Sequence, residues 1–321
     1  MACCRIEESI VGMIRKSNLP PDMLRIAPAR RESRFLGQGD IDVSFEFFPP
    51  RTAAMEKSLW RAIDRLGPLR PTSVAVTSGI DGTTRERTRV TVERILRETT
   101  LAPAVHLTRV GNTRAEIAET AAAYWNLGVR KLVALQGDAS TGGRYELGPD
   151  DYEYTCDMVA DLKGVANFEI TVAGYPEKHP AAGTIAADIA ALKDKVDAGA
   201  DRIITQFFFD NKLFFRFEEQ ARKRGVEAPI IPGILPIHNF KQVAAVAARC
   251  GVSIPSWLVR RFEGLENDPE THRLAAAAFA AEQVLGLVDR GVTEFHFFTL
   301  NRADLVYGIC HMLGLRSAEV A

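Results

Sequence analysis

The 321-residue chain has few cysteines and no excess of either charge. Its five cysteines form no C-x-x-C pair, so the sequence predicts neither a disulfide framework nor a zinc site. The chain has 40 lysines and arginines and 41 aspartates and glutamates, a balance that argues against the basic surface of a nucleic-acid-binding protein. No apolar run reaches the roughly 18 residues of a membrane-spanning helix. These absences favour a soluble, cytoplasmic protein with neither nucleic acid nor membrane as partner.

Several nucleotide- and metal-binding motifs are absent as well. The nearest string to G-x-G-x-x-G, Gly37-Gln38-Gly39, precedes a strand pattern, where it cannot hold a diphosphate at the start of a helix. The six histidines lack the spacing of metal ligands, so we expect no metal site. His296 lies in an apolar run and is expected to be a hydrogen-bonded core residue rather than a catalyst. Proton donation and the binding of flat polar ligands remain, as in a cofactor-dependent enzyme.

The chain divides into a short extension and one large domain. Residues 1–38 are expected to form an N-terminal extension with a short amphipathic helix from Ile6 to Lys16, and residues 39–321 a single catalytic domain. In that domain, short apolar runs alternate with helical patterns, which is typical of βαβ units and a parallel sheet. Eight such runs favour an α/β fold of the closed (β/α)8 TIM-barrel type. The expected strands are Val43–Phe47, Ser73–Thr77, Ala104–Thr108, Lys131–Leu135, Glu169–Ala173, Arg202–Phe207, Ile230–Ile234 and Glu294–Phe298. Among the helices expected between them are Arg85–Arg97, Arg114–Asn126, Thr184–Ala198, Phe240–Arg249 and Leu274–Asp289.

Polar residues follow nearly every expected strand. Active sites of TIM barrels lie at the C-terminal ends of the strands. A single polar residue there is equally well a helix cap or a turn residue, but their recurrence at one rim predicts a catalytic face. The polar residues at the strand ends are Glu46, Thr77, His106, Thr108, Gln136, Asp138, Tyr175, Gln206 and the segment Thr299-Leu300-Asn301-Arg302.

Glu46 is the most distinctive of these residues. It lies among Phe45, Phe47 and Phe48, just before Pro49 ends the strand. Aromatic surroundings remove water from a carboxylate, so the pKa of Glu46 is expected to rise toward the range useful for proton donation. The segment alone leaves a second interpretation open, a buried glutamate paired with an arginine elsewhere in the chain.

Seven segments, taken in chain order between about Ile41 and Leu315, resemble methylenetetrahydrofolate reductases. The resemblance implies the barrel-only bacterial form, a flavin-containing (β/α)8 barrel. It implies ping-pong chemistry in which NADH or NADPH reduces bound FAD. The reduced FAD then converts 5,10-methylenetetrahydrofolate to 5-methyltetrahydrofolate. The matching segments are Ser44 to Pro50, His106 to Thr108, Ala134 to Asp138, Gly174 to Pro180, Ile204 to Asp210, Pro232 to Pro236 and Phe297 to Ala303.

The same resemblance assigns roles to individual residues. Glu46 would be the general acid that opens the five-membered ring of the folate to an iminium, and Asp138 would lie near the flavin and the pterin. The expected folate contacts are Gln206, Gln242 and Arg302, the last binding the glutamate carboxylate of the folate. The expected FAD contacts are Thr77, His106, Gln136, Gly137, Asp138, Tyr154, Tyr175, His179, Asp188 and Lys195. Without the resemblance, Thr77 and Tyr175 are read as turn and packing residues, and Asp188 and Lys195 as a solvated helix face.

The chain departs from the family pattern where the phosphates of FAD are expected. Gln136 and Asp194 stand where arginines are usual, which removes one positive charge and reverses another. Each lost charge-assisted contact weakens binding by ~1.5–3 kcal/mol unless Arg109, Arg144 or Lys193 supplies replacement charge. Two alternatives therefore stay open: direct hydride transfer from NADH without flavin, and a folate- or flavin-binding barrel without turnover.

The aromatic run from Phe214 to Phe217 bears on the oligomeric state. It suits either an interface in a homo-oligomer or the packing of a helix on the barrel. The second use is the commoner one.

Overall fold

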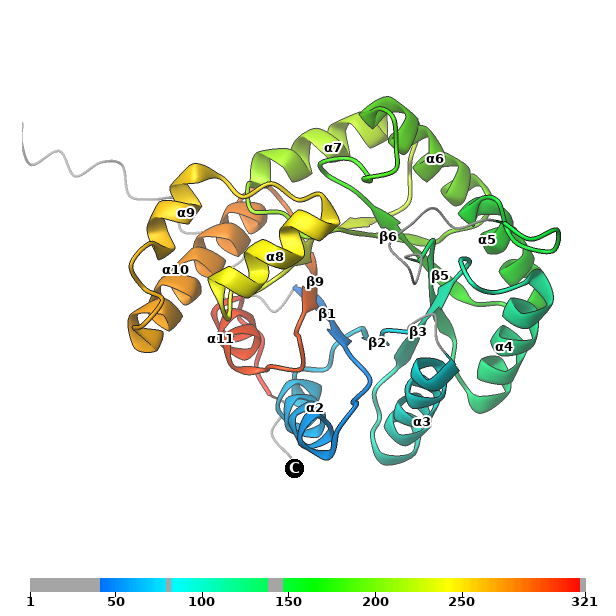
Figure 1. The fold of residues 1–321 in the computed structure, drawn as a ribbon, viewed down its shortest axis with the longest axis horizontal. Coiled ribbons are helices and arrows are strands. Elements are labelled where there is room, and N and C mark those ends of the chain that lie inside the picture. Colours follow the sequence, from blue (N-terminus) through cyan, green and yellow to red (C-terminus); the bar gives the residue numbers. More distant parts are fainter. Residues whose placement is uncertain (1–40, 79–81, 138–146, 318–321) are drawn as a thin grey trace, which may run out of the picture.

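The computed structural model describes residues 41–78, 82–137 and 147–317, and these form a barrel of parallel strands inside a ring of helices (Figure 1). Every pair of neighbouring strands is parallel, in the order β7-β6-β5-β4-β3-β2-β1-β9-β8. The predicted (β/α)8 barrel is therefore confirmed. The strands are β1 (Asp42–Phe47), β2 (Ser73–Val76), β3 (Pro103–Thr108), β4 (Lys131–Leu135), β5 (Glu169–Gly174), β6 (Arg202–Thr205), β7 (Ile230–Ile231), β8 (Gly233–Ile234) and β9 (Glu294–Phe298).

The expected strand from Ile230 to Ile234 is interrupted. Pro232 has no N–H to donate, and it separates β7, which pairs with β6, from β8, which pairs with β9. The two short strands together close the ring. The carbonyl of Pro232 still accepts a hydrogen bond from the backbone N–H of His296 at 3.0 Å. The other expected strands agree with the structure to within one or two residues at their ends.

Helices surround the barrel, and those expected from the sequence are present. The expected pattern from Leu274 to Asp289 begins five residues earlier, because Asp268 caps a helix whose first residue is Pro269. The helices are α2 (Ala53–Leu66), α3 (Gly82–Glu98), α4 (Arg114–Leu127), α5 (Thr155–Val165), α6 (Ile185–Asp197), α7 (Asn211–Lys223), α8 (Phe240–Cys250), α9 (Ser256–Phe262), α10 (Pro269–Val288) and α11 (Asp304–Met312).

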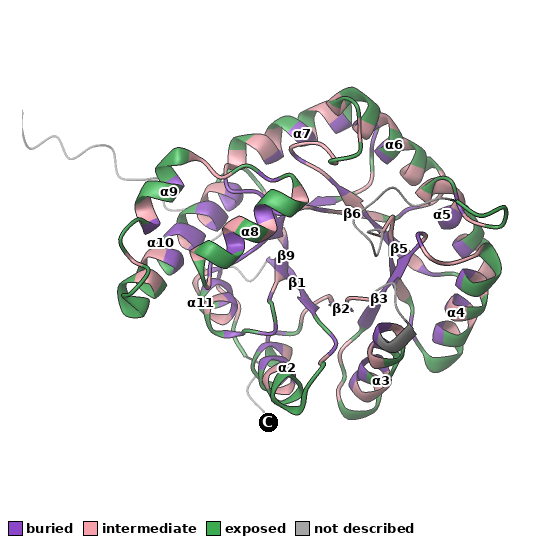
Figure 2. Ribbon diagram, in the orientation of Figure 1, coloured by how far each residue is buried: buried purple, intermediate pink, exposed green. Residues whose placement is uncertain are grey.

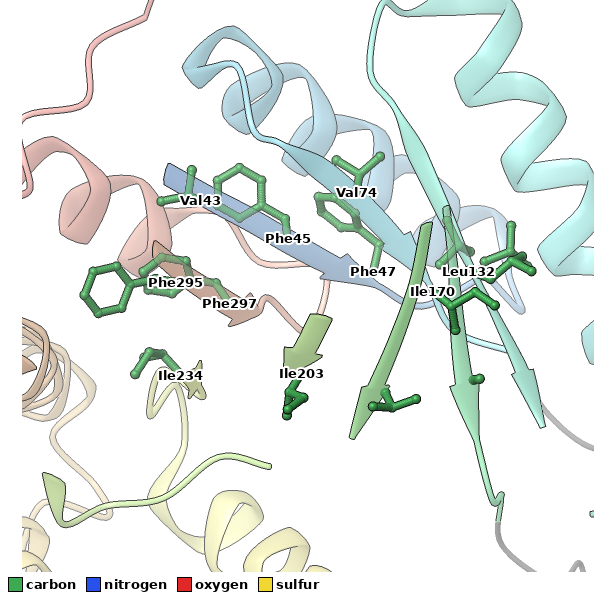
Figure 3. Packing of buried hydrophobic residues seen from close by; sticks show 14 of the residues in the cluster. Val43, Phe45, Phe47, Val74, Leu132, Ile170, Ile203, Ile234, Phe295 and Phe297 are labelled. Carbon is green, nitrogen blue, oxygen red and sulfur yellow. The ribbon is translucent and has the colours of Figure 1, made fainter. Parts of the chain in front are cut away.

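The two faces of the strands differ in polarity because side chains alternate along a strand. On β1, Val43, Phe45 and Phe47 point outward and are at most 1% exposed. They pack with Phe295 and Phe297 of β9 and with the helices in the main hydrophobic core, as Figure 3 shows. The strands and the inner faces of the helices are buried, while the outer helix faces are exposed (Figure 2).

The aromatic run on α7 belongs to this outer core. Phe214 and Phe217 are 0% and 2% exposed, and Phe214 stacks on Phe208 with ring centroids 5.5 Å apart. These rings pack α7 against the barrel.

Charged residues fill the N-terminal end of the barrel. Lys131 binds Glu169 at 3.1 Å, and Arg202 bridges Glu169 and Glu294. These side chains come from four different strands and leave a cavity of only about 20 Å³, close to the space of one water molecule. The N-terminal end of the barrel is therefore filled by a network of ion pairs.

The predicted helix from Ile6 to Lys16 lies outside the described residues, so the division at residue 38 stays a prediction. Among the helices within residues 41–78, 82–137 and 147–317, none combines the length and the hydropathy that crossing a membrane requires.

Closure of the barrel predicts that replacing Gly233 destabilises the fold. A Cβ at this position would lie 2.1 Å from the carbonyl oxygen of Thr205 and 2.6 Å from the ring of Phe298. Gly233→Ala should lower the free energy of unfolding by about 1–3 kcal/mol, measured by urea denaturation. Gly308 in α11 is the matched control, since a Cβ there meets nothing within 4 Å. Gly308→Ala should be neutral or stabilising by about 0.5–1 kcal/mol. Equal stability of Gly233→Ala and the parent protein would contradict this account of the closure.

Candidate active site

Glu46 points into the barrel at the C-terminal end of β1 and is 8% exposed. Its Oε2 lies 3.4 Å from Nε2 of His106 on β3 and 3.7 Å from Nε2 of His296 on β9. The prediction that phenylalanines surround Glu46 is wrong, because Phe45 and Phe47 face the helices and Phe48 is 38% exposed. Among the described residues, no arginine pairs with Glu46 either. Two imidazoles flank this carboxyl group instead.

The expected rise in the pKa of Glu46 is also wrong. Burial does raise the pKa, and it is the largest single effect. The interaction with His296 and the positive charge that His106 and His296 can carry act in the opposite direction, and together they place the pKa of Glu46 below its ordinary value. Burial in turn lowers the pKa of His106, although Glu46 partly offsets it. The site is thus a coupled carboxyl–imidazole cluster rather than an isolated acid in an apolar pocket.

His296 is a buried, hydrogen-bonded residue as expected, but it also belongs to this cluster. It is 1% exposed, and its Nδ1 lies 2.9 Å from Oγ of Ser44. Ser44 is directly opposite His296 in the β1–β9 ladder, so the hydroxyl fixes the ring with Nε2 toward Glu46. The sequence did carry a signal for Ser44 and His296. Side chains alternate along a strand, so Ser44 and Glu46 on β1, and His296 on β9, point inward between apolar residues that point outward.

The turn between β9 and α11 is hydrogen-bonded to the end of β1. Oγ1 of Thr299 donates to the carbonyl of Glu46 at 2.6 Å. The Asn301 side chain accepts from the N–H of Phe48 and donates to its carbonyl, both at 2.9 Å. Leu300 and Asn301 have φ values of 52° and 56°, a left-handed conformation that asparagine tolerates better than most residues. These bonds place Arg302 beside the rim that carries Glu46.

Four of the expected FAD contacts are near one another after β5. The rings of Tyr175 and His179 meet edge to face at 4.6 Å, and the carboxylate of Asp188 accepts from the N–H of His179 at 2.9 Å. Lys195 turns inward and donates to the carbonyl of Ala173 at 2.8 Å. Burial lowers the pKa of Lys195 to about 8, against the opposing charge of Asp188. The interpretation of Asp188 and Lys195 as a solvated helix face is therefore wrong.

The remaining expected FAD contacts lie at the ends of other strands and at the start of α5. Thr77 and Gln136 are half-buried directly after β2 and β4. Gly137 has a φ of 82°, and a Cβ there would lie 2.8 Å from Cβ of Thr108, so only glycine suits this turn. Tyr154 is 58% exposed at the start of α5. Asp138 lies outside the described residues.

The expected folate contacts lie at three places on the same rim. Gln206 follows β6 and its Oε1 accepts from the N–H of Phe207 at 3.0 Å. Gln242 is exposed in the first turn of α8. Arg302 is exposed in the turn before α11. None of the three is in hydrogen-bond contact with another in the described part of the chain, so a ligand would have to span them.

The residues suggested as sources of replacement charge are engaged elsewhere. Nη1 of Arg109 donates to the carbonyl of Tyr152 at 3.0 Å, and Lys193 pairs with Asp197 on the outside of α6. Asp194 is exposed, whereas the adjacent Lys195 is directed inward. Arg144 lies outside the described residues. Within the described ranges, no three His, Cys, Asp or Glu side chains form a group that could hold a metal ion.

The chain is similar to known proteins over most of its length. Residues 31–314 match the family described as "Methylenetetrahydrofolate reductase". The chain is 50% identical over 280 residues to the 5,10-methylenetetrahydrofolate reductase of Salmonella typhimurium and 48% identical to that of Escherichia coli. Each alignment covers 87% of this chain and 93% of the relative. Methylenetetrahydrofolate reductase (NADH) 1 of Arabidopsis thaliana is 33% identical, with 87% of this chain matching 49% of the plant protein.

Among solved structures, one similar fold is an uncharacterized protein from Clostridium thermocellum whose structure is described as binding two copies of 5-methyl-5,6,7,8-tetrahydrofolic acid. Its TM-score is 0.58 at 15% identity, covering 85% of this chain and 94% of that one. At this identity the likeness concerns the fold alone.

The coupled cluster predicts that His296 holds down the pKa of Glu46. His296→Phe removes the imidazole and leaves burial less opposed, so the pKa of Glu46 should rise. The measurement is the carboxyl band of protonated Glu46 in infrared difference spectra recorded against pH, identified by its loss in Glu46→Gln. His311→Phe, an exposed position on α11, is the control and should leave the band unchanged. A fall in the pKa of Glu46 in His296→Phe would overturn the arrangement.

Proposed function

The chain belongs to the methylenetetrahydrofolate reductase family, whose members are oxidoreductases, and we propose that it reduces 5,10-methylenetetrahydrofolate to 5-methyltetrahydrofolate. The donor would be NADH or NADPH. The observation that carries the proposal is the position of Glu46, a buried carboxyl group on the inner face of the barrel rim with two imidazoles within 4 Å. A protein that only binds its ligand has no need of a buried ionisable group, which costs stability.

Glu46 is proposed as the general acid. Protonation of a ring nitrogen makes that nitrogen a better leaving group, so the five-membered ring of the folate opens to an iminium that accepts hydride. In the protein alone the pKa of the carboxyl group is lowered, so ligand binding must raise it before Glu46 can donate a proton. A flat ligand over the rim would exclude water and strengthen burial, the one influence that raises the pKa of Glu46.

The residues after β5 fit FAD chemically. Lys195 offers a partly buried cation for a phosphate oxygen, and Asp188 fixes the loop in which Tyr175 and His179 present aromatic edges. When bound, FAD would supply the hydride carrier between nicotinamide and folate. Asp138 is proposed to lie near the flavin and the pterin, and Gln206, Gln242 and Arg302 to bind the folate. Thr77, His106, Gln136, Gly137 and Tyr154 complete the proposed FAD contacts.

Direct hydride transfer from NADH is the second candidate function. It is favoured because Arg109 and Lys193, the described residues that might replace the missing positive charge, are bonded elsewhere, while Gln136 and Asp194 carry no positive charge. Kinetics distinguish the two routes, because a bound flavin gives ping-pong patterns whereas direct transfer needs a ternary complex.

Replacement of Glu46 tests the acid. Glu46→Gln keeps the shape of the side chain but cannot donate the proton in the same way, so folate reduction should fall by about 10²–10⁴-fold. Reduction of the flavin by NADH, followed by loss of its visible absorbance, should continue at the parent rate. Glu227→Gln, an exposed glutamate remote from the rim, is the matched control and should keep both half-reactions. If the rate of the folate half-reaction is unchanged in Glu46→Gln, Glu46 is not the general acid.

The pH dependence of FAD binding tests Lys195. The ammonium group is present below the pKa of about 8 and is lost above it, and a bound phosphate would raise that pKa. Affinity for FAD, measured by flavin fluorescence quenching, should therefore fall as the pH rises through about 8. Lys195→Gln should bind FAD more weakly at pH ~7 and lose this dependence, because its amide does not titrate there. Lys193→Gln, whose lysine pairs with Asp197, should keep it. A protein that binds no FAD at any pH would support direct hydride transfer.

A further inference from the structure

The loop between β5 and α6 carries two of the proposed FAD contacts, but apolar burial does little to hold it in place. It runs from Tyr175 to Thr184, whose side chain caps α6. In this fully described range Pro176 is the only buried residue, and no side chain belongs to the hydrophobic clusters. A segment with few buried apolar contacts opens locally at little cost in free energy. The positions of Tyr175 and His179 therefore depend on polar contacts.

The turn in the middle of this loop has a strained backbone. Lys178 has a φ of 88°, in the left-handed region that residues other than glycine rarely adopt. Its N–H donates to the carbonyl of Tyr175 at 3.1 Å, and its ammonium group donates to the carbonyl of Ala182 at 2.5 Å. Such a conformation persists only where the surrounding structure determines it. The turn thus needs support from outside the loop.

Two carboxylates connect the loop to its surroundings. Asp188 of α6 accepts from the N–H of His179 at 2.9 Å, as described above. Glu177, within the loop, accepts from the N–H of Ser253 at 3.1 Å and 3.2 Å and also from the Ser253 hydroxyl. Ser253 follows α8 and lies 76 residues further along the chain. Hydrogen bonds to an ionised acceptor are stronger than those between neutral groups, so this contact joins the two segments firmly.

The segment that receives Glu177 is itself fixed in the protein. Val252 is 8% exposed in the second hydrophobic cluster, and Ile254 packs against the same cluster. Between them, Ser253 is exposed on the side of the loop. The two segments also approach at Gly251, where a Cβ would lie 3.1 Å from Cγ of Pro180. The loop after β5 is therefore docked on a connection that apolar burial holds in place.

A loop held in its bound conformation matters in a cofactor site that lacks expected charge. Gln136 and Asp194 stand where the family pattern has arginines, and neither supplies a cation. Ordering a loop during binding costs free energy, and a loop that is ordered beforehand avoids this cost. Affinity for FAD then depends more strongly on how well Tyr175 and His179 are positioned before the cofactor binds.

We propose that Glu177 is a positioning residue of the FAD site. Its carboxylate, docked on Ser253, holds the loop that presents Tyr175 and His179 to the cofactor. The inference rests on the proposed function, which places FAD against this loop. Glu177 acts through the loop and contacts neither FAD nor folate. Loss of its contact with Ser253 lets the strained turn at Lys178 relax and moves both rings.

Binding of FAD to the apoprotein, followed by flavin fluorescence quenching, tests the positioning role. Glu177→Ala should raise the Kd for FAD roughly tenfold. Glu177→Gln keeps a carbonyl oxygen that can accept from the N–H of Ser253, so it should recover part of the loss. Glu227→Ala, at an exposed glutamate between α7 and β7, is the matched control and should bind FAD like the parent protein.

The folate half-reaction separates positioning from catalysis. With FAD at saturating concentration, its rate in Glu177→Ala should stay within about twofold of the parent rate, because the loss concerns cofactor binding alone. A parent-like Kd for FAD in Glu177→Ala would overturn the proposal. A folate half-reaction that collapses although FAD is saturating would overturn it as well.

A double-mutant cycle tests the partner of Glu177. Ser253→Ala removes the hydroxyl donor but keeps the N–H, so it should raise the Kd for FAD less than Glu177→Ala does. If Glu177 acts through Ser253, adding Ser253→Ala to Glu177→Ala should raise the Kd no further. Additive effects of the two substitutions would show that the residues act separately and would overturn the proposed contact.

Hydrogen exchange in the apoprotein tests the docked loop without any cofactor. Backbone amides from Tyr175 to Thr184 should exchange roughly tenfold faster in Glu177→Ala than in the parent protein, whereas those of α4 should be unchanged. If the parent protein binds no FAD but the variant shows this faster exchange, the proposed cofactor is refuted while Glu177 still positions the loop. Unchanged exchange in Glu177→Ala would overturn the role of Glu177, whatever the protein binds.

Discussion

Parallel pairing between β1 and β9 is the constraint on which the site depends. The register sets Ser44 opposite His296 and Glu46 opposite Phe298, although about 250 residues separate them in the chain. Because side chains alternate along strands, this register brings the hydroxyl, the imidazole and the carboxyl group to the inner face, with Phe45 and Phe297 in the outer core. A slip by one residue would exchange these sets and place phenyl rings where the titrating groups now meet. The bonds from Thr299 and Asn301 to the end of β1 support the same register.

In this barrel, the residues that stabilise the fold and the residues of the candidate site lie on opposite faces of the strands. The outer face of the strands and the inner faces of the helices form an apolar core of the kind that dominates folding free energy. The inner face contains charged groups at both ends, and each is paired: Lys131, Glu169, Arg202 and Glu294 below, and Glu46 with two histidines above. Buried charge is tolerated only with such partners. The same rule explains why the pKa of Glu46 is lowered rather than raised.

The sequence predicted most of the fold and the rim but not the surroundings of Glu46. Strand and helix periodicity located the strands nearly to the residue, because apolar spacing is a local property. The strand around Pro232 was predicted as one piece, since the pairing of its two halves with different neighbours depends on closure. Proximity along the chain suggested that Phe45, Phe47 and Phe48 enclose Glu46. In a strand, adjacent residues point apart, and the real neighbours come from β3 and β9.

The ion pairs among Lys131, Glu169, Arg202 and Glu294 determine how ligands can reach the inside of the barrel. They close its N-terminal end, where the remaining cavity has room for about one water molecule. Glu46, at the opposite end of β1, is therefore reached from the C-terminal rim rather than through the barrel. For the proposed reaction, nicotinamide and folate would both have to approach from that rim.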